Sequence, residues 1–130
     1  MRCLTLADQL RDDGWDTSFC CSPETRGTIP LLENSGHRLF EGPICENGAT
    51  DWLVIDHYGL DIEFEKSCRS HAKQIMVIDD LPTRMHECDI LIDQNLGRVP
   101  EDYRGLVPST AIVATGTAYA LLRPQFAQAR

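Results

Sequence analysis

The sequence predicts an α/β fold, a parallel Rossmann-like sheet with flanking helices. Three short apolar runs, at residues 52–55, 75–78 and 90–92, are rich in β-branched side chains and do not alternate with polar ones. Such runs are typical of strands buried on both faces, as in parallel sheets. Each run is followed directly by a polar cluster: Asp56-His57-Tyr58, Asp79-Asp80 and Asp93-Gln94-Asn95. Because ligands of open α/β sheets bind beyond the carboxyl ends of the strands, these clusters predict a polar cleft at one edge.

The first half of the chain is predicted to hold two helices and two short strands. Apolar residues at positions 3, 6, 7 and 10 have the spacing of an amphipathic helix, which Gly14 would end. A short strand is expected at residues 17–21. Proline and glycine interrupt residues 22–50, which leaves room for a short helix at 29–34 and a short strand at 38–40.

The second half is predicted to begin with a β-α-β unit. Strand 52–55 leads to a helix that Asp61 would cap, with an apolar stripe of Phe64, Cys68, His71 and Ala72. A strand at 74–78 completes the unit, and its crossover should be right-handed. Further strands are expected at 89–92 and 111–114, and a terminal helix at 126–130.

Length and charge limit the function classes. The chain has 130 residues, which suits one domain with a real core, and its formal net charge is −8. An acidic chain is a poor partner for nucleic acid or an anionic membrane surface, and it should not supply most contacts to a phosphorylated ligand. No apolar stretch approaches the roughly 20 residues that a membrane helix needs, and no secretory signal is visible.

The six cysteines predict a reducing compartment. They show no C-x-x-C pair and no zinc-type spacing, and most lie in or beside apolar segments. We therefore expect buried thiols in a cytoplasmic protein. No metal site is predicted, because Asp79 and Asp80 provide too few oxygen ligands and Cys88, beside His86, should pack under a strand. No cofactor is predicted either.

The order of the elements predicts that the first strand of the fold is missing. A doubly wound domain opens with a strand, a glycine-rich loop and then the first helix, whereas this sequence opens inside a helix. The strands at 17–21 and 52–55 would then lack their shared neighbour. Their open edges are expected to make the chain prone to self-association.

A set of motifs runs nearly from end to end of the chain. They are MRCLTLA (1–7), DHYGLD (56–61), IDDL (78–81), Arg84, HECD (86–89), DQN (93–95) and YALLRP (119–124). Together they resemble the UDP-2,4-diacetamido-2,4,6-trideoxy-β-L-altropyranose hydrolase family of pseudaminic acid biosynthesis, a route to bacterial flagellin glycosylation. The resemblance implies release of 2,4-diacetamido-2,4,6-trideoxy-L-altrose from UDP by water, and a fold related to the two-domain GT-B glycosyltransferases.

The resemblance also implies that this sequence is one part of such an enzyme. In the family, a histidine on a glycine-rich loop just before the MRCLTLA block is the presumed general base, and a C-terminal domain holds most of the UDP. This sequence contains neither feature. Residues 1–130 would then form a single N-terminal domain that faces the sugar of a UDP-sugar, across a cleft with the other domain. The chain alone is expected to be inactive.

Tyr58 is the candidate for direct involvement in catalysis, because it follows a strand tip where its phenol could hydrogen-bond substrate or water. The alternative interpretation is an aromatic side chain packed on the cleft wall. The candidate substrate-binding residues are Asp56, His57, Asp80 and Asn95. Each also has a structural interpretation, as a hydrogen-bonding group at a strand end or as a cap of a turn. For the Asp79-Asp80 pair, we expect one carboxylate to face the cleft and the other to cap the turn before Pro82.

Two other function classes fit parts of the sequence. A GT-B glycosyltransferase would use an acceptor hydroxyl in place of water, and the sequence separates it poorly from a hydrolase. A receiver-like signalling domain also carries acidic residues at strand ends, with Asp56 as phosphoacceptor. That class needs a lysine after a later strand, but Lys66 and Lys73 both fall in the helix expected after strand 52–55.

Overall fold

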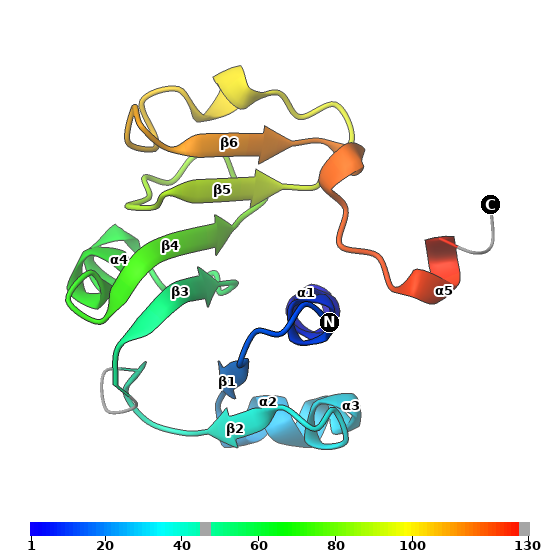
Figure 1. Cartoon of the computed structure of the whole chain (residues 1–130). Helices are drawn as coiled ribbons and strands as arrows, with labels where there is room; N and C mark the ends of the chain where they lie inside the picture. The colour runs from blue at the N-terminus through cyan, green and yellow to red at the C-terminus, as the bar shows by residue number, and fades with distance from the viewer. Residues whose placement is uncertain (45–47, 128–130) are drawn as a thin grey trace. The chain divides into compact units, whose positions relative to one another are not determined.

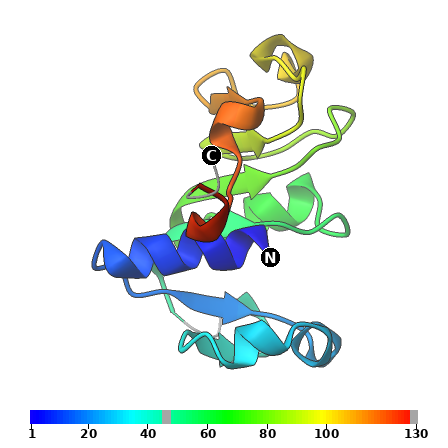
Figure 2. The same cartoon turned by 90° about the vertical axis from the view of Figure 1, so that its right-hand side faces the viewer.

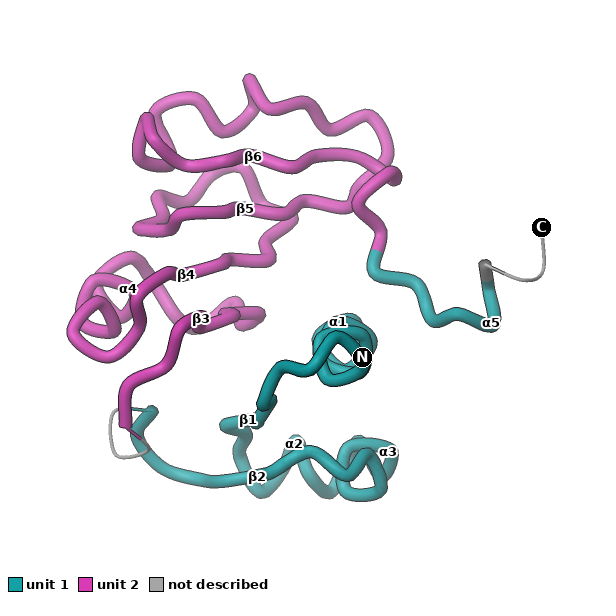
Figure 3. The backbone as a smooth tube through the Cα atoms, in the orientation of Figure 1, with its two compact units in different colours: residues 1–47, 121–130 teal, residues 48–120 magenta. Residues whose placement is uncertain are grey.

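A computed structural model describes residues 1–44 and 48–127 of the chain. The described residues fall into two compact units (Figure 3). Unit 1 comprises residues 1–47 and 121–130, and unit 2 comprises residues 48–120. Whether the chain is one domain, as expected, stays a prediction.

The described part of unit 1 contains four helices and a pair of short parallel strands. Its elements are α1 (Arg2–Asp12), β1 (Ser18–Cys20), α2 (Pro23–Thr28), α3 (Pro30–Glu33), β2 (Arg38–Phe40) and α5 (Pro124–Ala127). Figure 2 shows α1 lengthwise. The helix ends just before Gly14, whose φ of 94° is the left-handed conformation that glycine adopts without strain. Strand β1 pairs in parallel with β2, in register from Ser18 with Arg38.

Unit 2 is a four-stranded parallel sheet in the order β3-β4-β5-β6 (Figure 1). Its elements are β3 (Thr50–Ile55), α4 (Ile62–Cys68), β4 (Ala72–Ile78), β5 (Ile90–Asp93), η2 (Pro100–Tyr103), β6 (Ile112–Thr115) and η3 (Thr117–Tyr119). All neighbouring pairs in this sheet are parallel. The predicted α/β fold with a parallel sheet and flanking helices is therefore confirmed.

The core of unit 2 lies on one face of the sheet. Ile55, Ile75, Val77 and Leu91 point into it from β3, β4 and β5, at alternate positions along each strand. Helix α4 contributes Cys68 to this core. The side chains of Ile75 and Leu91 are completely buried. This packing fixes the strands whose ends carry the polar clusters.

Several expectations need correction. Helix α4 ends at Cys68, and Ala72 already belongs to β4, so His71 and Ala72 are not part of a helical stripe. Lys73 likewise lies in β4 rather than in the helix. Helix α2 was not predicted, because its glycine and proline suggested a loop; Pro23 occupies its first position, where proline is tolerated.

The thiols match the expectation only in part. Cys68 and Cys88 are buried, but Cys20 is exposed, because it lies on a short strand whose outer face is uncovered. Cys3 and Cys21 are half-buried, and Cys45 lies outside the described ranges. The expected helix at 126–130 extends beyond the described residues, where α5 covers Pro124–Ala127. Among residues 1–44 and 48–127, no helix is long and apolar enough to cross a membrane.

Strands β1 and β3 each have one edge that carries no strand partner within the described part of the chain. Strand β1 pairs with β2 alone, and β3 pairs with β4 alone. The backbone groups of such edges need water or another chain segment as hydrogen-bond partners. The self-association expected from these edges stays a prediction.

Replacing Asp61 by alanine should destabilise unit 2 by about 1 kcal/mol. The Asp61 carboxylate caps α4 by accepting a hydrogen bond from the Phe64 amide at 3.1 Å, as predicted. Urea denaturation followed by circular dichroism would measure the loss. Asp61→Asn is the matched control, because asparagine caps about as well. Equal stability of the alanine variant and the unaltered chain would contradict the cap.

Candidate functional site

The polar clusters meet at the carboxyl edge of the unit 2 sheet. In the parallel register, Ile55 of β3 pairs with Val77 of β4, and Ile78 of β4 pairs with Ile92 of β5. The residues that follow these strands therefore leave the sheet side by side, as predicted.

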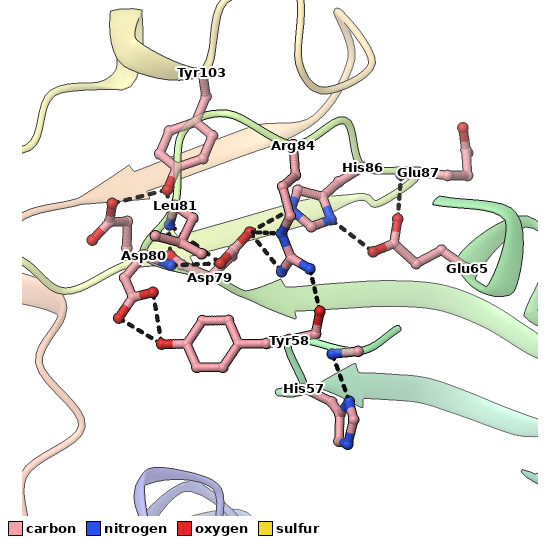
Figure 4. A network of polar contacts seen from close by, with 12 residues as sticks. His57, Tyr58, Glu65, Asp79, Asp80, Leu81, Arg84, His86, Glu87 and Tyr103 are labelled. Carbon is pink, nitrogen blue, oxygen red and sulfur yellow. Dashed lines mark hydrogen bonds and ion pairs between the residues drawn. The ribbon is translucent and has the colours of Figure 1, made fainter. Parts of the chain in front are cut away.

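Asp79 is the centre of the polar network at this edge (Figure 4). Its side chain is buried, with a relative exposure of 1% for the residue. Oδ1 accepts hydrogen bonds from the backbone amides of Asp80 at 2.8 Å and Leu81 at 3.2 Å, so Asp79 caps the turn before Pro82. Oδ2 accepts hydrogen bonds from Arg84 Nη2 at 3.0 Å and from the His86 ring. Of the aspartate pair, Asp79 is thus the capping residue.

His86 bridges two buried carboxylates. Its Nε2 lies 2.7 Å from Asp79 Oδ2, and its Nδ1 lies 2.7 Å from Oε1 of Glu65 on α4. Both ring nitrogens can donate only in the imidazolium form. Burial lowers the pKa of His86, but the hydrogen bonds that the ring donates to Glu65 and Asp79 outweigh burial and raise this pKa. The ring is therefore a buried cation that holds α4 against the loop after β4.

The pKa of Asp79 responds in the opposite direction. Burial raises it, but hydrogen bonds from His86 and Arg84 more than offset this effect, so the pKa lies below its ordinary value. Arg84 and His86 together provide two positive charges beside one buried carboxylate. Glu65 completes the cluster, and its Oε2 accepts a hydrogen bond from the Glu87 amide at 2.6 Å.

Tyr58 and Asp80 form the exposed part of the edge. The Tyr58 hydroxyl lies 2.7 Å from Asp80 Oδ1 and 2.8 Å from Oδ2. Tyr58 is 60% exposed, so this residue can be reached by a ligand. Arg84 Nη1 donates to the Tyr58 carbonyl at 2.7 Å, and the guanidinium carbon lies 5.9 Å from the centre of the Tyr58 ring. Of the predicted site residues, Tyr58 and Asp80 are thus in direct contact.

A second buried carboxylate supports the end of β5. Asp93 is completely buried, and its Oδ2 accepts a hydrogen bond from the Tyr103 hydroxyl at 2.8 Å. Arg98 Nε lies 2.7 Å from the same oxygen in an ion pair, although its N–H is not aimed at that oxygen. Arg98 Nη2 also donates to the Asp80 carbonyl at 3.3 Å. Burial and the neighbouring Asp93 raise the pKa of Tyr103, which keeps it a neutral donor.

The remaining predicted site residues also lie at this edge of the sheet. None of the hydrogen bonds given above joins one of them to Tyr58. Asp56 is half-buried directly after β3. His57 is exposed, and its Nδ1 accepts a hydrogen bond from the Gly59 amide at 2.9 Å, which fits the structural interpretation of this residue. Asn95 is exposed, and its backbone amide donates to Asp93 Oδ1 at 3.0 Å. Substrate binding by Asp56, His57, Asp80 and Asn95 stays a prediction.

Comparison with known proteins adds one relative. Over 133 aligned residues the chain is 33% identical to UDP-2,4-diacetamido-2,4,6-trideoxy-beta-L-altropyranose hydrolase of Campylobacter jejuni. The alignment covers 98% of this chain and 47% of that protein. The chain is a relative of this hydrolase. It spans about half the length of the curated protein that it matches, and no protein-family model matches it.

The motifs that carry the resemblance to the hydrolase family form much of this edge. DHYGLD supplies Tyr58 and the cap Asp61, and IDDL supplies Asp79 and Asp80. HECD supplies His86, and also Cys88, whose thiol is buried. Burial raises the pKa of Cys88 to about 12, so this thiol is inert. The predicted packing of Cys88 under the strand is confirmed.

Sequence reasoning missed Glu65, Tyr103 and Arg98 as parts of the edge. Glu65 carried a signal, since it lies three residues before Cys68 and therefore on the buried face of α4. A carboxylate on a buried helix face needs a partner, which His86 supplies. No local pattern marked Tyr103 or Arg98, because their contacts depend on the path of the chain between β5 and β6.

Proposed function

We propose that the chain is the sugar-facing part of a UDP-sugar hydrolase in pseudaminic acid biosynthesis. The reaction would release 2,4-diacetamido-2,4,6-trideoxy-L-altrose and UDP by attack of water at the anomeric carbon. The relationship to the Campylobacter jejuni hydrolase supports this reaction. The observation that carries the proposal is the exposed Tyr58, whose hydroxyl donates to Asp80 at the carboxyl edge of the sheet.

In this proposal Tyr58 contacts the attacking water. The Tyr58 hydroxyl donates its proton to Asp80, and its oxygen would accept a hydrogen bond from the water. A phenol that donates to a carboxylate is a better acceptor, because neighbouring hydrogen bonds polarise one another. The water would then lie against the anomeric carbon with its own lone pair directed at that carbon. UDP would depart with the electron pair of the broken glycosidic bond, and the proton of the water would pass to a general base, which in the hydrolase family is presumed to be a histidine.

Asp56, His57 and Asn95 are proposed to bind the sugar around this point. They follow neighbouring strands at the same edge, and His57 and Asn95 are exposed. Amide and carboxylate groups can hydrogen-bond the acetamido groups and the hydroxyl of the sugar. The UDP part is proposed to be held mainly by residues outside this chain, because a net charge of −8 disfavours a diphosphate.

Product analysis with the gene product that carries these residues would test the proposal. Incubation with the UDP-sugar in isotopically labelled water should yield free sugar and UDP, and the UDP should contain no label, because the bond to the anomeric carbon breaks. Labelled UDP would indicate attack at phosphorus and contradict the proposed chemistry. A glycoside in place of free sugar would support the glycosyltransferase alternative.

A further inference from the structure

We propose that Asp79 and Arg84 are positioning residues that hold Tyr58 at two points without touching the substrate. The two points are the backbone carbonyl of Tyr58 and its hydroxyl group. The proposed reaction provides the kinetic readout for this inference, but the positioning itself can be measured independently of that reaction.

The first connection runs from Asp79 Oδ2 to the Tyr58 backbone. Arg84 Nε and Nη2 donate to Oδ2 at 3.2 and 3.0 Å, which orients the guanidinium plane. The remaining nitrogen, Nη1, donates to the Tyr58 carbonyl at 2.7 Å. The same group lies near the face of the Tyr58 ring, at 5.9 Å from its centre. Arg84 therefore restrains both the backbone and the ring of Tyr58.

The second connection runs from Asp79 Oδ1 to the Tyr58 hydroxyl. Oδ1 accepts the Asp80 amide at 2.8 Å and thereby fixes the backbone of Asp80. The Asp80 carboxylate then accepts the Tyr58 hydroxyl with both oxygens. The two oxygens of one buried carboxylate thus control opposite ends of Tyr58 (Figure 4).

Asp79 is suited to this role because it is itself immobile. It is 1% exposed, and His86 and Glu65 hold it from the side of α4. A residue this buried does not reach a ligand, so its effect on a reaction must pass through Arg84 and Asp80. Tyr58, in contrast, is 60% exposed. Loss of either connection should shift the phenol, and a displacement of about 1 Å can cost about 100-fold in rate.

The kinetic test uses Arg84→Met in the gene product that carries these residues. We expect kcat to fall about 10- to 100-fold while KM changes by less than about 3-fold, because Arg84 acts on the geometry of Tyr58 and not on substrate binding. Arg69→Met is the matched control. Arg69 is likewise ion-paired, with Glu87 and Asp89, at comparable exposure but makes no contact with Tyr58. Its kcat should be unchanged.

A double variant separates positioning from direct contact with the substrate. In a Tyr58→Phe background, adding Arg84→Met should lower kcat no further, because residues that act through one group are not additive. A further loss, or a rise in KM with kcat unchanged, would overturn the inference and assign Arg84 to the substrate. If Tyr58→Phe itself leaves turnover intact, the proposed function fails, whereas the positioning is still decided by the measurement below.

NMR of isotope-labelled tyrosine in the 130-residue chain measures the positioning without turnover. The Tyr58 signal is assigned with Tyr58→Phe. In Arg84→Met it should move toward the signal of the exposed Tyr119, and in Arg69→Met it should stay in place. Arg84→Gln, which keeps a side-chain donor, serves if the methionine variant does not fold, and it should give a smaller shift. An unmoved Tyr58 signal in a folded Arg84 variant would overturn the inference.

Discussion

Replacing Tyr58 by phenylalanine is expected to lower kcat of the gene product about 100- to 1,000-fold, the usual cost of losing one hydrogen-bonding group that acts in the transition state. The variant removes a single oxygen and keeps the ring under Arg84. That oxygen is the atom of Tyr58 that donates to Asp80. KM should change little, because the phenol is proposed to contact the attacking water rather than the nucleotide.

Tyr119→Phe is the matched control for this prediction. Tyr119 is 51% exposed, close to the 60% of Tyr58, and lies after β6 in the same unit. Removal of its hydroxyl should leave kcat unchanged. Steady-state kinetics of the two variants would decide, and a Tyr58 variant as active as the Tyr119 variant would exclude a direct role of the phenol.

The second large effect concerns stability: His86→Ala should reduce the free energy of unfolding by about 3–5 kcal/mol. The His86 ring lies 2.7 Å from oxygens of both Glu65 and Asp79, and both carboxylates are buried. Its removal leaves these two groups without the cation between them. His71→Ala is the control, because the hydrogen bonds that fix His71 come from its backbone, and its cost should stay below about 1 kcal/mol. If urea denaturation showed similar losses of unfolding free energy for both variants, the stabilising role of His86 between the two buried carboxylates would be contradicted.

The same cluster predicts a pH dependence of stability. Carboxylate hydrogen bonds raise the pKa of His86 in the folded chain, so its contribution is complete below the ordinary histidine value of about 6.5 and is lost as the pH rises through the raised pKa. The lowered pKa of Asp79 affects stability at acidic pH. The contribution of Asp79 to the free energy of unfolding is lost as the pH falls through that pKa. Stability should therefore decline above about pH 6.5, and His86→Ala should flatten this decline. An unchanged profile would contradict the charged state of His86.

The sequence was sufficient to predict the sheet and the edge where the polar residues gather. The runs at 75–78 and 90–92 lacked alternation, and both proved to be parallel strands with buried side chains. Asp61 was recognisable as a helix cap from its position before an apolar stripe. These predictions rest on local sequence patterns. The structure confirms them because the tertiary contacts favour the same strands and the same helix cap.

The network behind Tyr58 could not be predicted in the same way. Glu65 and His86 are separated by 21 positions in the chain and meet only because α4 packs against the loop after β4. Which of Asp79 and Asp80 caps the turn, and which contacts Tyr58, also depended on the fold. Both follow β4, but Asp79 is buried against His86, whereas Asp80 contacts Tyr58. Sequence reasoning supplied the pair, whereas packing determined which carboxylate caps the turn.

NMR titration of the 130-residue chain with 2,4-diacetamido-2,4,6-trideoxy-L-altrose tests most directly whether the carboxyl edge receives the sugar. The amide signals that shift should belong to the loops after β3, β4 and β5, around Tyr58, Asp80 and Asn95, and Tyr58→Phe should reduce the shifts near Asp80. Shifts that gather at the opposite edge of the sheet, around Ala72 and Ile90 where β4 and β5 begin, would contradict the proposed site.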